Sequence, residues 1–163
     1  MNYKYLTLGI TNINKQYWQD IRNRTFVKPS GGLWASPYIE QGKYKSQWHK
    51  FTSEEFHDKS YNYGVIFNLK HNANIYVINS YEDFSNLLKD NKLSTEFDTL
   101  FSSDRFSFLD FEKLSHIYDA ILLTAKGEIE TRYCMGANLY GWDVESLLIL
   151  NFDCIDEQSY IEF

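Results

Sequence analysis

The chain has 163 residues, 44% of them hydrophobic, which suits one domain with a sizeable hydrophobic core. Its mean hydropathy is −0.45, and no apolar run approaches the ~20 residues of a membrane span. These values indicate a soluble globular protein and exclude a membrane protein, so we expect no membrane partner. The N-terminus also lacks the basic segment and apolar run of a secretory signal, and we expect a cytoplasmic location.

Aromatic residues make up 18% of the chain, with 13 Tyr and 12 Phe, so the core must contain many ring contacts. The two cysteines, Cys134 and Cys154, stand alone without a CxxC spacing. We expect both to be reduced core residues, as is usual in a cytoplasmic protein.

The net charge of −6 hides an uneven distribution along the chain. Residues 1–52 contain eight Lys or Arg against Asp20 and Glu40, a net charge of +6, whereas residues 53–163 carry a net charge of −12. The first third can attract phosphate groups, or its cations can simply lie on solvated helix faces and loops. Both interpretations stay open at the level of sequence.

The first third of the chain predicts two strands and one or two helices. Residues 3–10 alternate between polar and apolar side chains and predict a strand. Residues 12–24 place apolar side chains four apart, which predicts a helix that the following glycines end. Residues 33–38 read as a short strand closed by a proline. Residues 46–56 are polar and aromatic, and predict either a short helix or a mobile loop.

The middle of the chain alternates strand and helix signals. Strands are predicted over 63–69 and 73–80, which are rich in β-branched and aromatic residues. A helix is predicted over 80–91, with Ser80 as its N-cap and acidic residues in its first turn. A loop and then a helix over 110–117 follow.

The last third reads as strands. Residues 119–125 predict a buried strand, residues 127–134 a strand that pairs with it, and residues 142–151 another buried strand. Residues 152–163 form a final edge strand or extension. Runs of strands with few helices predict one domain over 1–163, of the α+β class, with a mixed, mainly antiparallel split sheet flanked by helices.

The segment YGWDVESLLILN, residues 140–151, carries two acidic residues at the start of an apolar run. Alternation in a strand would put Asp143 and Glu145 on one face and Val144 on the other. Carboxylates are costly to bury unless they are paired or used in chemistry. The segment therefore predicts either a functional carboxylate or two solvated residues at the mouth of a strand.

Several common active-site motifs are missing. The four histidines have no metal-ligand spacing and HExxH is absent, so we expect no metal site. The glycine-rich stretch KPSGGLWASPY, residues 28–38, contains no GxSxG and no GxGxxG, which argues against a serine hydrolase and a phosphate-binding loop. The stretch is either a tight loop leading into an edge strand or one wall of a ligand pocket.

Three segments together resemble the ADP-ribosyltransferase superfamily: LTLG near the N-terminus, GGLWAS after it, and WDVESLLILN near the C-terminus. In that family a first strand ends in His-Gly or Arg-Gly, and a second reads roughly Gly-aromatic-small-Ser. A third carries the catalytic glutamate before an apolar run. On this resemblance Gly9 matches the first motif, residues 32–36 match the second, and Glu145 matches the glutamate. Leu8 departs from the pattern, because the family has His or Arg there.

The resemblance implies an NAD-dependent glycosyltransferase that uses NAD as co-substrate and no metal. Glu145 would be catalytic, stabilising the cationic sugar that forms when the nicotinamide–ribose bond breaks. Trp34 would stack on the nicotinamide in a cleft that Glu145 also lines. Lys28 would pair with a phosphate, and the glycines would admit the dinucleotide closely. The implied NAD-binding residues are Gly9, Lys28, Gly31, Gly32, Leu33, Trp34 and Ser36, and the implied acceptor-binding residues are Asp143 and Trp142.

We therefore expect a toxin- or effector-like ADP-ribosyltransferase, of the toxin–antitoxin kind, that modifies a macromolecular acceptor. The basic first third favours nucleic acid as the acceptor, whereas Asp143 favours a basic or polar protein. A cognate antitoxin protein is a further expected partner. The alternative is a non-catalytic binding protein on an α+β scaffold, in which Glu145 is a strand-end residue and Trp34 a core anchor.

Overall fold

The computed structural model describes residues 3–24, 28–56, 61–93, 107–134, 136–137, 139 and 141–163. The strands within these residues are β1 (Lys4–Leu8), β2 (Leu33–Pro37), β3 (Tyr63–Leu69), β4 (Ile75–Ile78), β5 (Ala120–Leu123), β6 (Ser146–Ile149) and β7 (Ile155–Glu162). The α-helices are α1 (Gln47–Glu55), α2 (Tyr81–Asp90), α4 (Phe111–Leu114) and α5 (Ala125–Thr131). Single 3-10 turns form at Lys15–Tyr17 and Phe152–Cys154.

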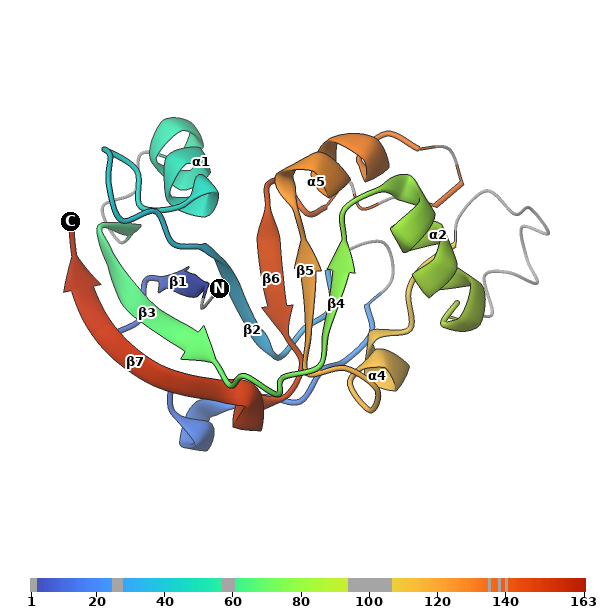
Figure 1. Cartoon of the computed structure of the whole chain (residues 1–163), viewed down its shortest axis with the longest axis horizontal. Helices are drawn as coiled ribbons and strands as arrows, with labels where there is room; N and C mark the ends of the chain where they lie inside the picture. The colour runs from blue at the N-terminus through green and yellow to red at the C-terminus, as the bar shows by residue number, and fades with distance from the viewer. Residues whose placement is uncertain are drawn as a thin grey trace.

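The described strands form one seven-stranded sheet in the order β4-β5-β6-β2-β1-β3-β7. Each neighbouring pair is antiparallel except β4 and β5, which are parallel. Strand β2 joins two halves, since its end pairs with β1 at Tyr5↔Pro37 and its start pairs with β6 at Leu33↔Ile149. Figure 1 shows β3 and β7 curving across the lower left while β4, β5 and β6 stand upright beside them.

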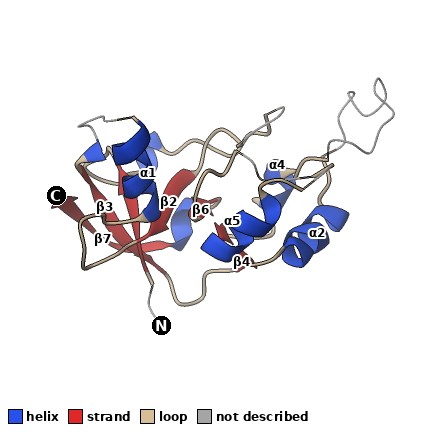
Figure 2. Ribbon diagram, turned by 90° about the horizontal axis from the view of Figure 1, so that it is seen from above, coloured by secondary structure: helices blue, strands red, loops and turns tan. Residues whose placement is uncertain are grey.

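Alternating side chains of this sheet build two hydrophobic cores. One face contributes Ile121 and Leu148 to a core that the helices α2 and α4 cover with Phe84 and Leu114. The opposite face contributes the side chains between the two halves of the sheet, among them Tyr5, Ala35, Val65, Phe67, Leu147 and Ile149. Figure 2, seen from above, shows α2, α4 and α5 beside the β4–β6 half and α1 near β2 and β3.

Much of the predicted architecture is confirmed. The class is α+β with a mixed, mainly antiparallel sheet, and the strands predicted over 3–10, 33–38 and 63–69 are present as β1, β2 and β3. Ser80 caps α2 by accepting a hydrogen bond from the Asp83 N–H. Residues 46–56 form the helix α1 rather than a loop. Cys154 is buried as predicted. The prediction of Cys134 as a core residue is wrong, because it follows the last turn of α5 and is only partly buried, with its thiol donating to the Glu130 carbonyl.

The helix predicted over 12–24 is wrong, because only the 3-10 turn at Lys15–Tyr17 forms there. The apolar side chains that suggested one helix face lie in different parts of the structure. Ile13 packs into the core between the sheet halves, Ile21 packs into the helix-covered core, and Tyr17 is 75% exposed. Their spacing therefore comes from an irregular segment that passes from one core to the other.

The strand predicted over 127–134 is also wrong, because most of the segment forms α5. Thr124 caps this helix by accepting a hydrogen bond from the Gly127 N–H. Gly127 lies so close to the Ile78 carbonyl that a Cβ would clash with it, so the first turn of α5 packs directly on β4. Local capping and this close approach favour helix over strand pairing.

Two other predictions need adjustment. The helix predicted over 110–117 is shorter, at Phe111–Leu114, and the loop predicted before it lies largely outside the described residues. Strand β6 begins at Ser146, so Asp143 and Glu145 precede the strand and do not share one of its faces by alternation.

Among the residues described, no helix has the length and apolarity to cross a membrane. No group of three or more His, Cys, Asp or Glu there could hold a metal ion.

Candidate functional site

Glu145 is fixed at the entrance to β6 from two directions. The Ser36 hydroxyl of β2 donates a hydrogen bond of 2.8 Å to the Glu145 carbonyl oxygen. The Ala125 backbone N–H, at the start of α5, donates to the Glu145 carboxylate over 3.4 Å. Ser36, implied by the resemblance to bind NAD, therefore uses its hydroxyl to position the backbone of Glu145.

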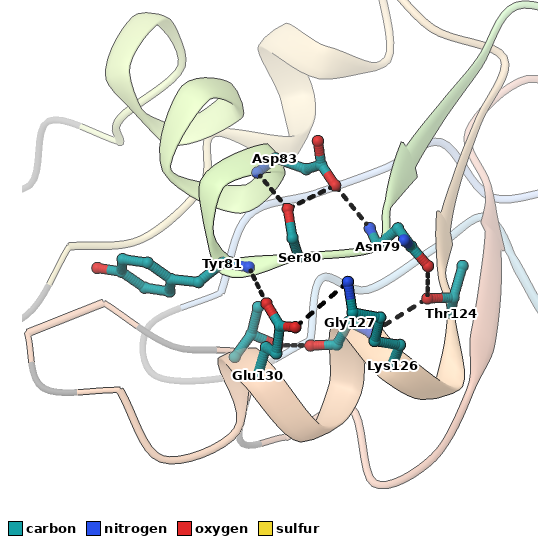
Figure 3. A network of polar contacts seen from close by, with 9 residues as sticks. Asn79, Ser80, Tyr81, Asp83, Thr124, Lys126, Gly127 and Glu130 are labelled. Atoms are coloured by element: carbon teal, nitrogen blue, oxygen red, sulfur yellow. Dashed lines mark hydrogen bonds and ion pairs between the residues drawn. The ribbon is translucent and has the colours of Figure 1, made fainter.

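The start of α5 is itself held by the polar network in Figure 3. The Thr124 hydroxyl donates to the Asn79 side chain over 2.8 Å and accepts from the Gly127 N–H. The Asp83 carboxylate accepts from the Asn79 N–H and the Ser80 hydroxyl. The first turns of α2 and α5 are thus tied together, and Ala125, directly after Thr124, is held with them.

The Glu145 carboxyl lies in a partly dehydrated environment. Burial raises its pKa above the ordinary value, and the hydrogen bond from Ala125 opposes part of that rise. The pKa of Tyr5 in β1 is raised to about 12, mainly by burial, with further increases from Tyr3 and the negative charge of Glu145. Glu145 is therefore electrostatically linked to the core between the two sheet halves.

Asp143, two positions before Glu145, contacts an ammonium group that lies near two tryptophan rings. The Lys28 Nζ is 5.3 Å from the ring centre of Trp34 in β2 and 4.9 Å from that of Trp48 in α1. It also donates to the Asp143 carboxylate over 3.1 Å. We call Trp34, Trp48 and Asp143 the cation cage, because each stabilises a positive charge at this position.

Neighbouring side chains hold the residues of the cation cage in place. The Trp34 ring packs edge-on against Trp142 with 4.7 Å between ring centres, and Trp142 is only 2% exposed. Arg132 of α5 donates to the Asp143 carbonyl over 3.0 Å and lies 3.9 Å from its carboxylate. With Lys28 in place, the remaining cavity is about 30 Å³, lined by Lys28, Trp34, Ala35, Trp48 and Ser146.

The cavity of about 30 Å³ that Trp34 lines does not include Glu145 among its lining residues. Trp34 packs on the helix-covered core, whereas the negative charge of Glu145 contributes to the raised pKa of Tyr5 in the other core. The two residues are connected through Ser146, which lines that cavity and directly follows Glu145. Trp142 belongs to the helix-covered core, so it supports Trp34 and has no surface to offer an acceptor.

Gly9, Gly32 and Leu33 line a separate cavity of about 420 Å³. It lies at the far end of β1 from Tyr5, about 13 Å away along the strand. Its other lining residues are uncharged and partly aromatic: Ile10, Thr11, Asn12, Ile13, Asn14, Tyr17, Trp18 and Tyr63. Leu33 and Trp34 are consecutive in β2 and pack on different cores, so the residues implied to bind NAD are divided between the two faces of this strand. Among the described residues that line the 420 Å³ cavity there is no Lys or Arg to pair with a pyrophosphate.

Backbone packing explains why glycine occupies positions 31 and 32, without reference to a ligand. Both have positive φ angles, of 79° and 65°. Residues 19–22 run beside 30–32, with two hydrogen bonds between Arg22 and Ser30 and one from the Gly32 N–H to Gln19. A Cβ on Gly31 would clash with the Asp20 carbonyl, and one on Gly32 with the Ile149 carbonyl. These glycines let two chain segments approach each other.

The basic first third is paired in part with the acidic remainder of the chain. Lys15 pairs with Asp153 at 2.7 Å, Arg22 with Glu112 at 3.8 Å and Lys28 with Asp143 at 3.1 Å. Three of the eight cations in residues 1–52 are therefore bound to carboxylates from residues 53–163. Lys28 in particular is engaged with a carboxylate and not available to a phosphate in this state.

Sequence reasoning missed Trp48, Arg132 and the Ala125 N–H as parts of this site. Trp48 follows the helix cap Ser46, but nothing in its local sequence links it to Lys28 or Trp34. Arg132 was assigned to a strand and lies at the end of α5 instead. Only the packing of α1 and α5 around β2 and β6 brings these groups together.

Comparison with known proteins finds no match to a family model, to a curated protein or to a solved structure. The resemblance to ADP-ribosyltransferases therefore depends on the quoted motifs and on the geometry given above.

The packing reason for Gly32 predicts that Gly32→Ala lowers the free energy of unfolding by about 2–4 kcal/mol, because left-handed strain and a backbone clash add. Gly42 also has a positive φ, 118°, but a Cβ there would meet nothing within 4 Å. Gly42→Ala is therefore the matched control and should cost only the strain. Urea unfolding measures both variants, and equal losses would contradict the packing explanation.

The raised pKa of Glu145 predicts a pH-dependent effect on stability. Because the folded chain favours the protonated carboxyl, the free energy of unfolding contributed by Glu145 falls as pH rises above its ordinary pKa of 4.5. Glu145→Gln should therefore stabilise the protein at neutral pH and have little effect well below pH 4.5.

Asp153→Asn provides a control of opposite sign for that measurement. Lys15 lowers the pKa of Asp153, so this carboxylate contributes stability above its ordinary pKa of 3.8 and loses it as pH falls through the lowered value. Asp153→Asn should slightly destabilise the protein at neutral pH. Urea unfolding at pH 2.5 and pH 7 tests both variants, and a destabilising Glu145→Gln at pH 7 would contradict the assigned environment of Glu145.

Proposed function

We propose that the chain is an NAD-dependent ADP-ribosyltransferase with Glu145 as its catalytic residue. The observation that carries the proposal is the partly dehydrated Glu145 carboxyl, which accepts a hydrogen bond from the Ala125 N–H while the Ser36 hydroxyl holds the Glu145 backbone. Asp143 of the cation cage lies two positions before Glu145 in the chain. Perturbed carboxyl groups that are held in place at a stability cost cluster at functional sites. The three segments that carry the family resemblance also become neighbouring strands β1, β2 and β6, which supports it.

The proposed reaction uses charge stabilisation and proton transfer. The bond between the ribose carbon and the nicotinamide nitrogen breaks, and the electron pair leaves with nicotinamide. The Glu145 carboxylate stabilises the positive charge that develops on the sugar. The acceptor nucleophile then bonds to the same ribose carbon, and Glu145 accepts its proton.

The cation cage suits the nicotinamide end of NAD. The bound nicotinamide ring carries a positive charge before the bond breaks, and Lys28 places an ammonium charge where Trp34, Trp48 and Asp143 stabilise it. For the ring to enter, Lys28 must leave the cage, since about 30 Å³ remains beside it. Once released from Asp143, Lys28 is free to pair with a phosphate, the role the resemblance implies for it.

The acceptor in this proposal is a macromolecule. Pairing of Lys15, Arg22 and Lys28 with carboxylates weakens the charge argument for nucleic acid, because these cations are neutralised locally. Asp143 is likewise engaged with Lys28 and Arg132. A panel containing both proteins and nucleic acids is therefore the appropriate set of acceptors.

A non-catalytic binding protein is the second candidate, and one observation favours it. Trp34 is covered by Trp142 on one side and by Lys28 on another, so it already acts as a core anchor. In this alternative Glu145 is a strand-end residue that closes the gap between β6 and α5. Such a protein would neither bind NAD nor release nicotinamide.

Nicotinamide release separates the two candidates. Wild-type protein incubated with NAD and the acceptor panel should release nicotinamide, measured by chromatography. Glu145→Gln should lower the rate by at least about 100-fold, because it keeps the size of the side chain and removes its charge. The same variant should relieve growth inhibition in bacteria that express the protein.

The control for this experiment is Glu40→Gln, an exposed acidic residue in the loop after β2, which should leave the rate unchanged. Tryptophan fluorescence would follow NAD binding separately from turnover. Wild-type protein that neither binds NAD nor releases nicotinamide would overturn the enzyme proposal and leave the binding protein. Equal rates for Glu145→Gln and wild type would remove Glu145 from the catalytic role.

A further inference from the structure

The strand β7 is a long, open edge of the sheet. It has eight residues, twice the length of β4 at the other edge, and among the described strands it pairs with β3 alone. Residues Asp156 to Tyr160 are all exposed. Figure 1 shows β7 along the outer rim of the molecule. An edge of this length presents backbone groups to any extended chain that can reach it.

The hydrogen bonds of the last residues tell which backbone groups face outward. The Phe163 N–H donates to the Asn62 carbonyl across the β3–β7 pair over 3.0 Å. In an antiparallel pair the residues alternate between facing the partner strand and facing away. The N–H and C=O groups of Gln158, Tyr160 and Glu162 therefore point away from β3.

The side chains on this edge are acidic. Asp156, Glu157 and Glu162 lie on β7, and the strand contains no Lys, Arg or Pro. The Tyr160 hydroxyl donates to the Glu162 carboxylate over 2.6 Å, which leaves both side chains together at the edge. A strand added beside β7 would place its side chains next to these carboxylates, and opposite charges across strands are stabilising.

The same charges disfavour a second copy of this chain as the added strand. Antiparallel pairing of two β7 strands about Ser159 would place Asp156 of one copy opposite Glu162 of the other. Like charges directly opposite each other in a sheet are destabilising. This register of self-pairing is therefore disfavoured, and any β7–β7 contact brings together three carboxylates from each copy and no Lys or Arg, while the edge stays complementary to a basic strand.

We propose that β7 is a docking site for an extended, lysine- or arginine-containing segment of another protein, which binds by adding a strand to the sheet. Backbone hydrogen bonds to Gln158, Tyr160 and Glu162 give the register, and the carboxylates of β7 select the basic partner. This interface is independent of Glu145 and of the proposed transfer of ADP-ribose.

The test uses the full chain and a labelled eight-residue peptide that alternates lysine and valine. Fluorescence anisotropy should show saturable binding that weakens with added salt. Tyr160→Pro removes one outward N–H and should weaken peptide binding at least 10-fold. Tyr160→Ala loses the same ring but keeps the N–H, so it should bind the peptide more tightly than Tyr160→Pro does. Circular dichroism of the two variants would check that β7 is still folded.

A second measurement does not depend on either variant. Peptide binding to wild-type protein should slow hydrogen exchange at the amides of Gln158, Tyr160 and Glu162. The proposal fails if the lysine peptide does not bind, if Tyr160→Pro folds and binds like Tyr160→Ala, or if a glutamate–valine peptide binds equally well. A wild-type dimer in ultracentrifugation that Tyr160→Pro dissolves would replace the basic partner with a second copy.

Discussion

The double pairing of β2 is the constraint on which the other parts of this structure depend. One end of this strand is bonded to β1 and the other to β6, and together these pairings join the two halves of the sheet. Its side chains divide between both cores, Trp34 on the helix-covered side and Ala35 between the halves. Without β2, neither core would be closed and Glu145 would lose the bond from Ser36.

The charges of this protein are separated in sequence and mixed in space. Cations near the N-terminus pair with carboxylates that follow much later, and the Lys28–Asp143 pair spans 115 positions. Such pairs add little stability where they are exposed, as for Lys15 and Asp153. The Lys28 pair differs, because its ammonium group also lies 5.3 Å and 4.9 Å from the ring centres of Trp34 and Trp48.

Glu145 shows a local conflict of the kind found at functional sites. Burial disfavours the charged form of the Glu145 carboxyl. For folding alone, a neutral amide at this position would be more favourable. The polar network around Thr124 and Asn79 keeps the start of α5 against it. The chain thus holds a dehydrated carboxyl in a fixed orientation, which is the property that proton transfer and charge stabilisation require.

The α+β class, the strands β1, β2, β3 and β5, and the helix α2 with its Ser80 cap could be predicted without the structure, because periodicity and capping are local properties of the chain. The sequence also singled out Lys28, Trp34, Asp143 and Glu145. Only the tertiary structure decided that Lys28 lies between Trp34 and Trp48, that Trp142 is buried, and that residues 127–131 form a helix. Those outcomes depend on contacts between segments that are far apart in the chain, and no local pattern encodes which segments meet.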